Sequence, residues 1–171
     1  MTSFQETYNT ITGSKEFNQF KQEHPEAKLA AGFFILDFLS NDTKKSLDYI
    51  SEGSEKVFTF DLADDGYIKL KEDKLINPED TNQPKLTPIE PNPKVEVDEL
   101  NSIVETKKEK EGINSKLHKI IAVLQNHEER LTWNLTCMLD QLIIIHALVD
   151  AETKEIIKFE RKNMMDFIKK R

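Results

Sequence analysis

An alternating stretch followed by an unbroken apolar one constrains this chain more than any other feature. Between residues 132 and 140 every second side chain is apolar, which is the period of a half-buried strand. The apolar members are Trp133, Leu135, Cys137 and Leu139. After a predicted tight turn at Asp140-Gln141, residues 142–149 are almost entirely apolar and rich in β-branched side chains. We expect residues 142–149 to form a central strand that is covered on both faces.

Two further runs extend this pattern on either side. Residues 119–124 form a short apolar run that ends in a polar turn at 126–130. Residues 150–155 have turn composition, and the apolar residues 156–159 follow them. Short apolar runs bounded by polar turns are typical of consecutive antiparallel strands. Together the four runs predict a β-meander.

The first half of the chain shows a similar order of elements. Apolar residues at helical spacing predict a helix over 4–11, and Ser14 is a candidate N-cap for a second helix that presents Phe17 and Phe20. The strands predicted after them cover residues 29–39, 46–51, 57–62 and 67–70. A displacement of 86 residues places Leu47 on Trp133 and keeps one register through both meanders. This match of pattern predicts an internal repeat.

A proline-rich stretch separates the two halves. Residues 77–96 contain five of the six prolines, together with frequent charges, which is typical of an extended linker. Helical composition returns at Asp98, and Gly112 can end that helix. The predicted organisation is therefore a first unit at 1–76, a linker at 77–96 and a second unit at 97–171. The predicted fold class is α+β, with two repeated helix plus antiparallel β-meander units.

The second half resembles the PepSY domain family. Three features carry this resemblance: a helix, the segment Thr132-Trp133-Asn134-Leu135, and the turn Asp150-Ala151-Glu152-Thr153-Lys154-Glu155. Lys154 stands at a position where the family commonly has glycine. The first half is a weaker match. The resemblance implies a PepSY/cystatin-like fold in each unit. It also implies that the protein binds or inhibits peptidases, or acts as a sensor, without catalytic residues of its own.

Charge and cysteine content narrow the possible functions. The net charge of −7 disfavours a general nucleic-acid binder, because phosphate recognition requires clustered Lys and Arg. No apolar run approaches the roughly 20 residues of a membrane helix, so no membrane association is expected. The single cysteine cannot form an internal disulfide, and no secretion leader is recognisable at the N-terminus. We therefore expect a cytoplasmic protein.

Trp133, Cys137 and His146 are the candidate pocket residues. If Asp140-Gln141 is the turn, His146 shares a sheet face with Cys137 and Trp133. A thiolate nucleophile with a base requires such proximity, but a cysteine among apolar neighbours usually behaves as a small inert side chain. The four histidines lie in different predicted elements without ligand spacing. The sequence therefore predicts no catalytic residue, no metal site and no cofactor.

These features favour a non-catalytic protein-binding or regulatory module, with an inhibitor of peptidases as one form of it. One alternative is a small-ligand-binding protein or enzyme with a pocket near Trp133, Cys137 and His146. Another is a structural homodimer that pairs through an apolar sheet face. Residues 1–76 carry 14 acidic and 9 basic side chains, whereas residues 97–171 carry 13 of each. We expect an unidentified protein partner, and a basic partner would suit the acidic first half.

Overall fold

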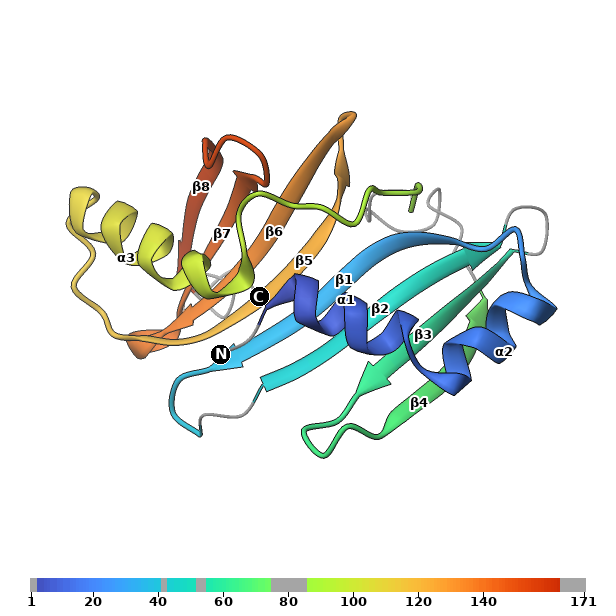
Figure 1. The fold of residues 1–171 in the computed structure, drawn as a ribbon. Coiled ribbons are helices and arrows are strands. Elements are labelled where there is room, and N and C mark those ends of the chain that lie inside the picture. Colours follow the sequence, from blue (N-terminus) through green and yellow to red (C-terminus); the bar gives the residue numbers. More distant parts are fainter. Residues whose placement is uncertain (1–2, 41–42, 52–54, 75–85, 164–171) are drawn as a thin grey trace.

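The chain forms a single eight-stranded antiparallel sheet with its helices on one side (Figure 1). The computed structural model describes residues 3–40, 43–51, 55–74 and 86–163. In chain order the strands are β1 (Lys28–Asp37), β2 (Thr43–Ser51), β3 (Lys56–Leu62), β4 (Ile68–Lys74), β5 (Leu117–His127), β6 (Arg130–Leu139), β7 (Ile143–Asp150) and β8 (Ile156–Asn163). Their spatial order is β4-β3-β2-β1-β5-β6-β7-β8. Each half therefore contributes four consecutive strands, and β1 and β5 meet at the centre.

Short helices cover one face of this sheet. The helices are α1 (Phe4–Thr12), α2 (Lys15–Glu23), the 3-10 turn η1 (Val97–Glu99) and α3 (Leu100–Lys110). Ser3 and Ser14 cap α1 and α2 as N-cap residues. The carboxylate of Glu96 also accepts hydrogen bonds from the backbone N–H groups of Phe4 and Gln5, at 2.8 and 3.2 Å. A negative charge is favourable at a helix N-terminus, so Glu96 ties the start of α1 to the segment before α3.

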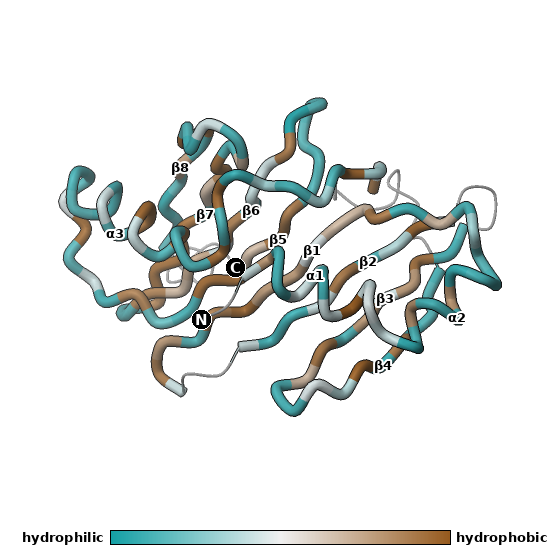
Figure 2. Tube along the Cα trace, in the orientation of Figure 1, coloured by the Kyte–Doolittle hydropathy of each residue, from teal (hydrophilic) through white to brown (hydrophobic). Residues whose placement is uncertain are grey.

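The core lies between the helices and the sheet. Phe17 and Phe20 of α2 pack against the rings of Tyr49, Phe58 and Phe60, with centroid separations of 5.0–5.9 Å. Alternate residues of β3 and β6 are buried and supply apolar side chains to this face. Figure 2 shows how hydropathy varies along the strands. One continuous cluster of buried apolar residues runs from α2 to α3. The two halves of the chain therefore share one hydrophobic core.

Residues 86–96, here called the strap, cross the helix-covered side of the sheet. The backbone N–H of Ile89 donates to the carbonyl of Leu29 at 2.8 Å. The N–H groups of Lys94 and Val95 both donate to the carbonyl of Ala151 at 2.9 Å. Ile89 and Val95 are buried. The part of the predicted linker that the structure describes is thus packed against the sheet, and residues 77–85 lie outside the described residues.

The predicted fold class, α+β with two repeated helix plus antiparallel β-meander units, is wrong. The structure is mainly one continuous sheet with few helices. Residues 32–37 of β1 pair with residues 119–124 of β5, which places Phe34 opposite Ala122 and Ile35 opposite Ile121. In two separate meanders β1 and β5 would each be an edge strand with unpaired N–H and C=O groups. Their pairing satisfies those groups and joins the halves through the backbone.

No helix in the described part of the chain has the length and apolar character that crossing a bilayer requires. The longest of them, α3, has 11 residues and carries three lysines in its last turn.

Candidate functional site

The structure separates the three residues that the sequence placed together. Trp133 and Cys137 lie on the helix-covered face and are fully buried, whereas His146 points to the opposite face. Cys137 pairs with Ile145, and the neighbouring pair is Thr136 with His146. Residues that pair directly across antiparallel strands share a face, and the next pair along lies on the other one. Trp133, Cys137 and His146 therefore do not line one pocket.

A one-residue error in the predicted register explains this difference. We predicted that Leu139 pairs with Leu142, whereas it pairs with Ile143 in the structure. Residues 140–142 form a 3-10 turn in which Gln141 and Leu142 have φ values of 66° and 58°. This turn holds one residue more than the predicted one, and a shift of one residue moves every side chain of a strand to the other face.

Neither Cys137 nor His146 has the surroundings of a nucleophile and its base. Burial raises the pKa of the Cys137 thiol to about 12, so the nucleophilic thiolate is scarce near neutral pH. Nε2 of His146 instead forms a hydrogen bond with Oδ1 of Asn134 at 2.8 Å. Within the described residues, no group of three or more His, Cys, Asp or Glu side chains could hold a metal ion.

The side of the sheet that faces away from the helices is the best candidate for a functional surface. We call it the open face. The cross-strand pairs Phe33 with Val123, Ile35 with Ile121 and Met138 with Ile144 point to this side. These six side chains are half-buried or exposed, although each belongs to a strand in the interior of the sheet. The described helices and the strap lie on the other side (Figure 1). The open face therefore presents an apolar centre that the described elements leave uncovered.

Lysines border this apolar centre. Lys44, Lys69 and Lys71 are exposed on β2 and β4, and Lys158 and Lys162 are exposed on β8. The register places Lys44 opposite Ile35 and Lys162 opposite Ile144, so both lysines project from the open face. An apolar centre with a charged rim is the usual anatomy of a protein interface.

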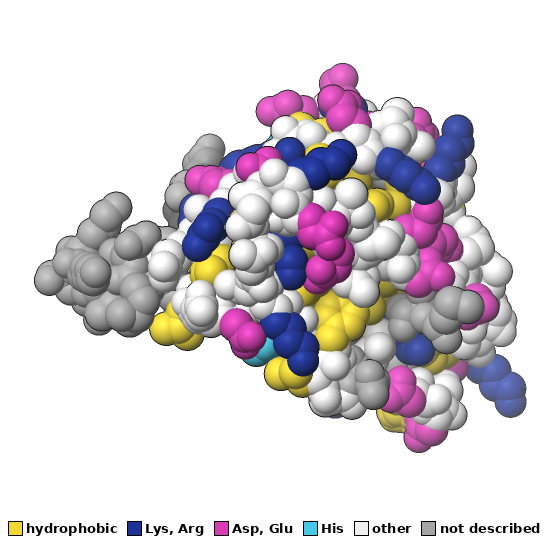
Figure 3. Space-filling model, turned by 90° about the vertical axis from the view of Figure 1, so that its left-hand side faces the viewer, with side chains coloured by type: hydrophobic (Ala, Val, Ile, Leu, Met, Phe, Trp, Pro, Cys, Tyr) yellow, Lys and Arg dark blue, Asp and Glu magenta, His cyan; other side chains and the backbone are white. Residues whose placement is uncertain are grey.

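The far end of the molecule has a different surface. Figure 3 shows the side on which α3 and β8 lie, where acidic and basic side chains alternate with small, separate apolar areas. Scattered apolar side chains of this kind are normal for any protein surface. The open face differs from it, because directly paired apolar side chains lie there on neighbouring strands.

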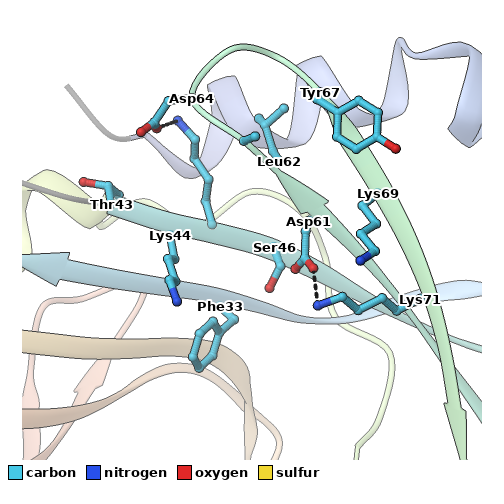
Figure 4. Close-up of a pocket in the computed structure, with 12 residues that line it drawn as sticks. Phe33, Thr43, Lys44, Ser46, Asp61, Leu62, Asp64, Tyr67, Lys69 and Lys71 are labelled. Carbon is cyan, nitrogen blue, oxygen red and sulfur yellow. Dashed lines mark ion pairs between the residues drawn. The ribbon is translucent and has the colours of Figure 1, made fainter.

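A pocket of about 510 Å³ lies at the β2–β4 end of the open face (Figure 4). Its lining includes Phe33, Lys44 and Ser46 from β1 and β2, and Asp61 and Lys71 from β3 and β4. The ammonium of Lys71 lies 2.8 Å from the carboxylate of Asp61. We call this cavity the lysine pocket. It continues the apolar centre, because Phe33 belongs to both.

Sequence reasoning missed these lysines. The sequence predicted a strand over residues 67–70, which contains Lys69, and assigned no role to its lysine. Their cross-strand positions beside Phe33 depend on the register of β1 to β4. Asp73 lies on the same face of β4 as Lys69 and Lys71, so the charge pattern of this strand alone gave no signal of a basic pocket.

Comparisons with known proteins show the fold and nothing more. No protein-family model matches the chain, and no curated protein matches it. The fold is similar to the crystal structure of a "putative lipoprotein" from Clostridium difficile 630, with a TM-score of 0.58 and 13% sequence identity. The match covers 86% of this chain and 90% of that chain. The resemblance to the PepSY family stays a prediction.

Proposed function

We propose that the protein is a non-catalytic binding module that holds a partner protein on the open face of its sheet. The observation that carries this proposal is the apolar centre of that face. Ile35 and Ile121 sit opposite each other on the two central strands, and each remains half-buried although both flanking strands are present. Apolar side chains grouped in this way on a surface mark interaction sites.

Two further observations support a binding role. The only thiol, Cys137, is buried and lies on the opposite face of the sheet from His146, so these two residues do not form a nucleophile with its base. The open face is also built on paired strands, so its side chains are held in fixed positions. A rigid surface loses little conformational entropy when a partner binds, and this favours recognition. The PepSY resemblance makes a peptidase one class of partner to test.

The proposal is tested by charge substitutions on the open face. Ile35→Glu and Ile121→Glu each place a carboxylate in the apolar centre, where an unpaired charge opposes binding. Leu70→Glu is the matched control, because Leu70 is also an apolar residue of a strand, is 42% exposed and pairs with Phe60 on the helix-covered face. Circular dichroism and thermal unfolding establish that each variant is folded.

The readout compares what each variant retains from a native lysate of the source cells. We expect a defined protein to be retained by the wild type and by Leu70→Glu, and to be lost with Ile35→Glu and Ile121→Glu. Equal retention by all four proteins would contradict the proposal. Light scattering on the same samples identifies a second copy of the chain as the partner, if a wild-type dimer becomes a monomer in the open-face variants.

A further inference from the structure

The lysine pocket carries more positive charge than its own side chains neutralise. Its lining contains four lysines and two aspartates, although the chain as a whole has a net charge of −7. Lys71 pairs with Asp61 at 2.8 Å, and Lys45 lies 4.0 Å from Asp64. Lys44 and Lys69 form no ion pair with any residue that the structure describes. The pocket therefore offers two ammonium groups to an incoming anion.

Aromatic side chains stand beside these charges. Phe33 lines the pocket and is half-buried, and the ring of Tyr67 is at the rim, where this residue is 65% exposed. Figure 4 shows Lys44 directly above Phe33, and Lys69 between Tyr67 and Lys71. A ligand that fills this pocket meets a lysine and an aromatic ring at once. It therefore needs an acidic group and an apolar group close together.

A small free anion does not fit these requirements. Three of the lysines that line the pocket are exposed, namely Lys44, Lys69 and Lys71. Ion pairs of exposed lysines are individually weak. An anion held only by such contacts would compete poorly with water and salt. Contact with Phe33 adds binding free energy only for a ligand that has apolar surface of its own.

We infer that the lysine pocket binds an acidic segment of the partner protein, in which an Asp or Glu side chain neighbours an aromatic or aliphatic one. This inference rests on the proposed function, because it places one part of the partner on the open face. The partner's carboxylate pairs with Lys44 or Lys69, and its apolar side chain contacts Phe33. It also differs from the expectation from composition, since the first half is acidic overall but its pocket is basic.

The test is selection of peptides from a random library displayed on phage, with the whole protein as the target. We expect the enriched peptides to contain Asp or Glu next to an aromatic or aliphatic residue. The tightest peptide is then synthesised, together with a version in which Gln or Asn replaces its acidic residue. Affinities of both peptides are measured by fluorescence anisotropy at low and high salt.

The double variant Lys44→Ala/Lys69→Ala should bind the acidic peptide about tenfold more weakly than the wild type does, which corresponds to the loss of two exposed ion pairs. The amide peptide should bind the wild type and the double variant equally, because it has no charge for the lysines to meet. Lys110→Ala/Lys116→Ala is the matched control, since it removes two exposed lysines near α3 and should change neither affinity. High salt should reduce the advantage of the acidic peptide.

Three results would overturn the inference. The first is a selection that yields no peptide, or only basic or uncharged ones. The second is an acidic peptide that keeps its affinity for Lys44→Ala/Lys69→Ala but loses it with Ile121→Glu, in which case the open face still binds and only the pocket is wrongly assigned. The third is an acidic peptide that is insensitive to all of these substitutions, and this result would contradict the proposed function as well.

Discussion

The indole N–H of Trp133 donates a hydrogen bond to the backbone carbonyl of Val95 over 2.8 Å, and both residues are fully buried. This bond connects the sheet to the strap. Trp133 also lies against Phe34, with ring centroids 5.9 Å apart. Because Phe34 belongs to β1 and Trp133 to β6, one side chain joins the first half, the second half and the segment between them.

Replacement of Trp133 by Phe should destabilise the protein by about 1–3 kcal/mol, because the buried carbonyl of Val95 loses its partner. Urea unfolding followed by circular dichroism measures this change. Phe34→Leu is a useful comparison, since it removes aromatic volume at the same place without removing a hydrogen bond. A loss below about 0.5 kcal/mol for Trp133→Phe would show that the hydrogen bond contributes little.

Asp150 holds together the turn before β8. Its carboxylate accepts hydrogen bonds from the N–H groups of Glu152 and Thr153 at 2.8 and 3.0 Å, and from Nε of Arg130 at 2.9 Å. We expect Asp150→Ala to cost about 2–3 kcal/mol in unfolding free energy, because these donors lose a charged acceptor. Glu155→Gln is the control. It alters only the exposed side of the Arg130 ion pair and should change stability very little.

The same carboxylate gives the protein an acid-sensitive contribution to stability. Burial alone would raise the pKa of Asp150, but the hydrogen bonds from Glu152 and Thr153 and the charge of Arg130 together lower it. A carboxyl with a lowered pKa in the folded state stabilises the fold above its ordinary pKa, and this stabilisation is lost as the pH falls through the folded value. Asp150→Asn should therefore flatten the acid limb of the stability curve. An unchanged acid limb would contradict this assignment.

Cys137 should be inert in the folded protein. It is fully buried, and burial raises the pKa of its thiol to about 12. The native protein should react with a disulfide reagent only after unfolding, so labelling with and without denaturant provides the measurement. Because the folded pKa is raised, the thiol lowers stability as the pH rises above its ordinary value. Cys137→Ala should remove this fall in stability at alkaline pH. Rapid labelling of the native state would contradict the prediction, because it would show that the thiol is accessible.

His146 should make the fold sensitive to mild acid. Burial, and then the charge of Lys158, lower the pKa of His146 from its ordinary value. The unfolded chain therefore binds this proton more readily, and stability should fall as the pH drops below about 6.5. His146→Gln, measured by urea unfolding between about pH 7.5 and about pH 5, should lack this fall. Identical curves for the two proteins would exclude His146 as its source.

The strands were predictable, but their arrangement was not. Alternation in β6 and the apolar run of β7 define those strands, because side chains in a strand point to alternate faces. The pairing of β1 with β5 has no such local signature. Phe33 and Phe34 are both apolar and point to opposite faces, which is typical of a strand inside a sheet. That feature alone does not show which strand lies beside β1.

The turn motif that suggested a family has a structural explanation in this fold. Asp150 closes the turn through its side chain, and the carbonyl of the buried Ala151 accepts two hydrogen bonds from the strap. Lys154, which stands where glycine is common in the PepSY family, has a φ of 69° and so adopts the left-handed conformation that glycine favours. The motif was therefore informative about the backbone. The turn at Gln141 determines which side chains of β7 lie on each face of the sheet, and the motif contains no information about that.

The pairing of β1 with β5 has a consequence for how the chain folds. Phe34 and Ala122 are partners in space but far apart in the sequence, so their strands meet only after a long loop has closed. Until that moment each half has an unprotected strand edge that another molecule can occupy. During synthesis, β1 emerges from the ribosome before β5, and in this interval its unpaired edge makes the nascent chain prone to aggregation.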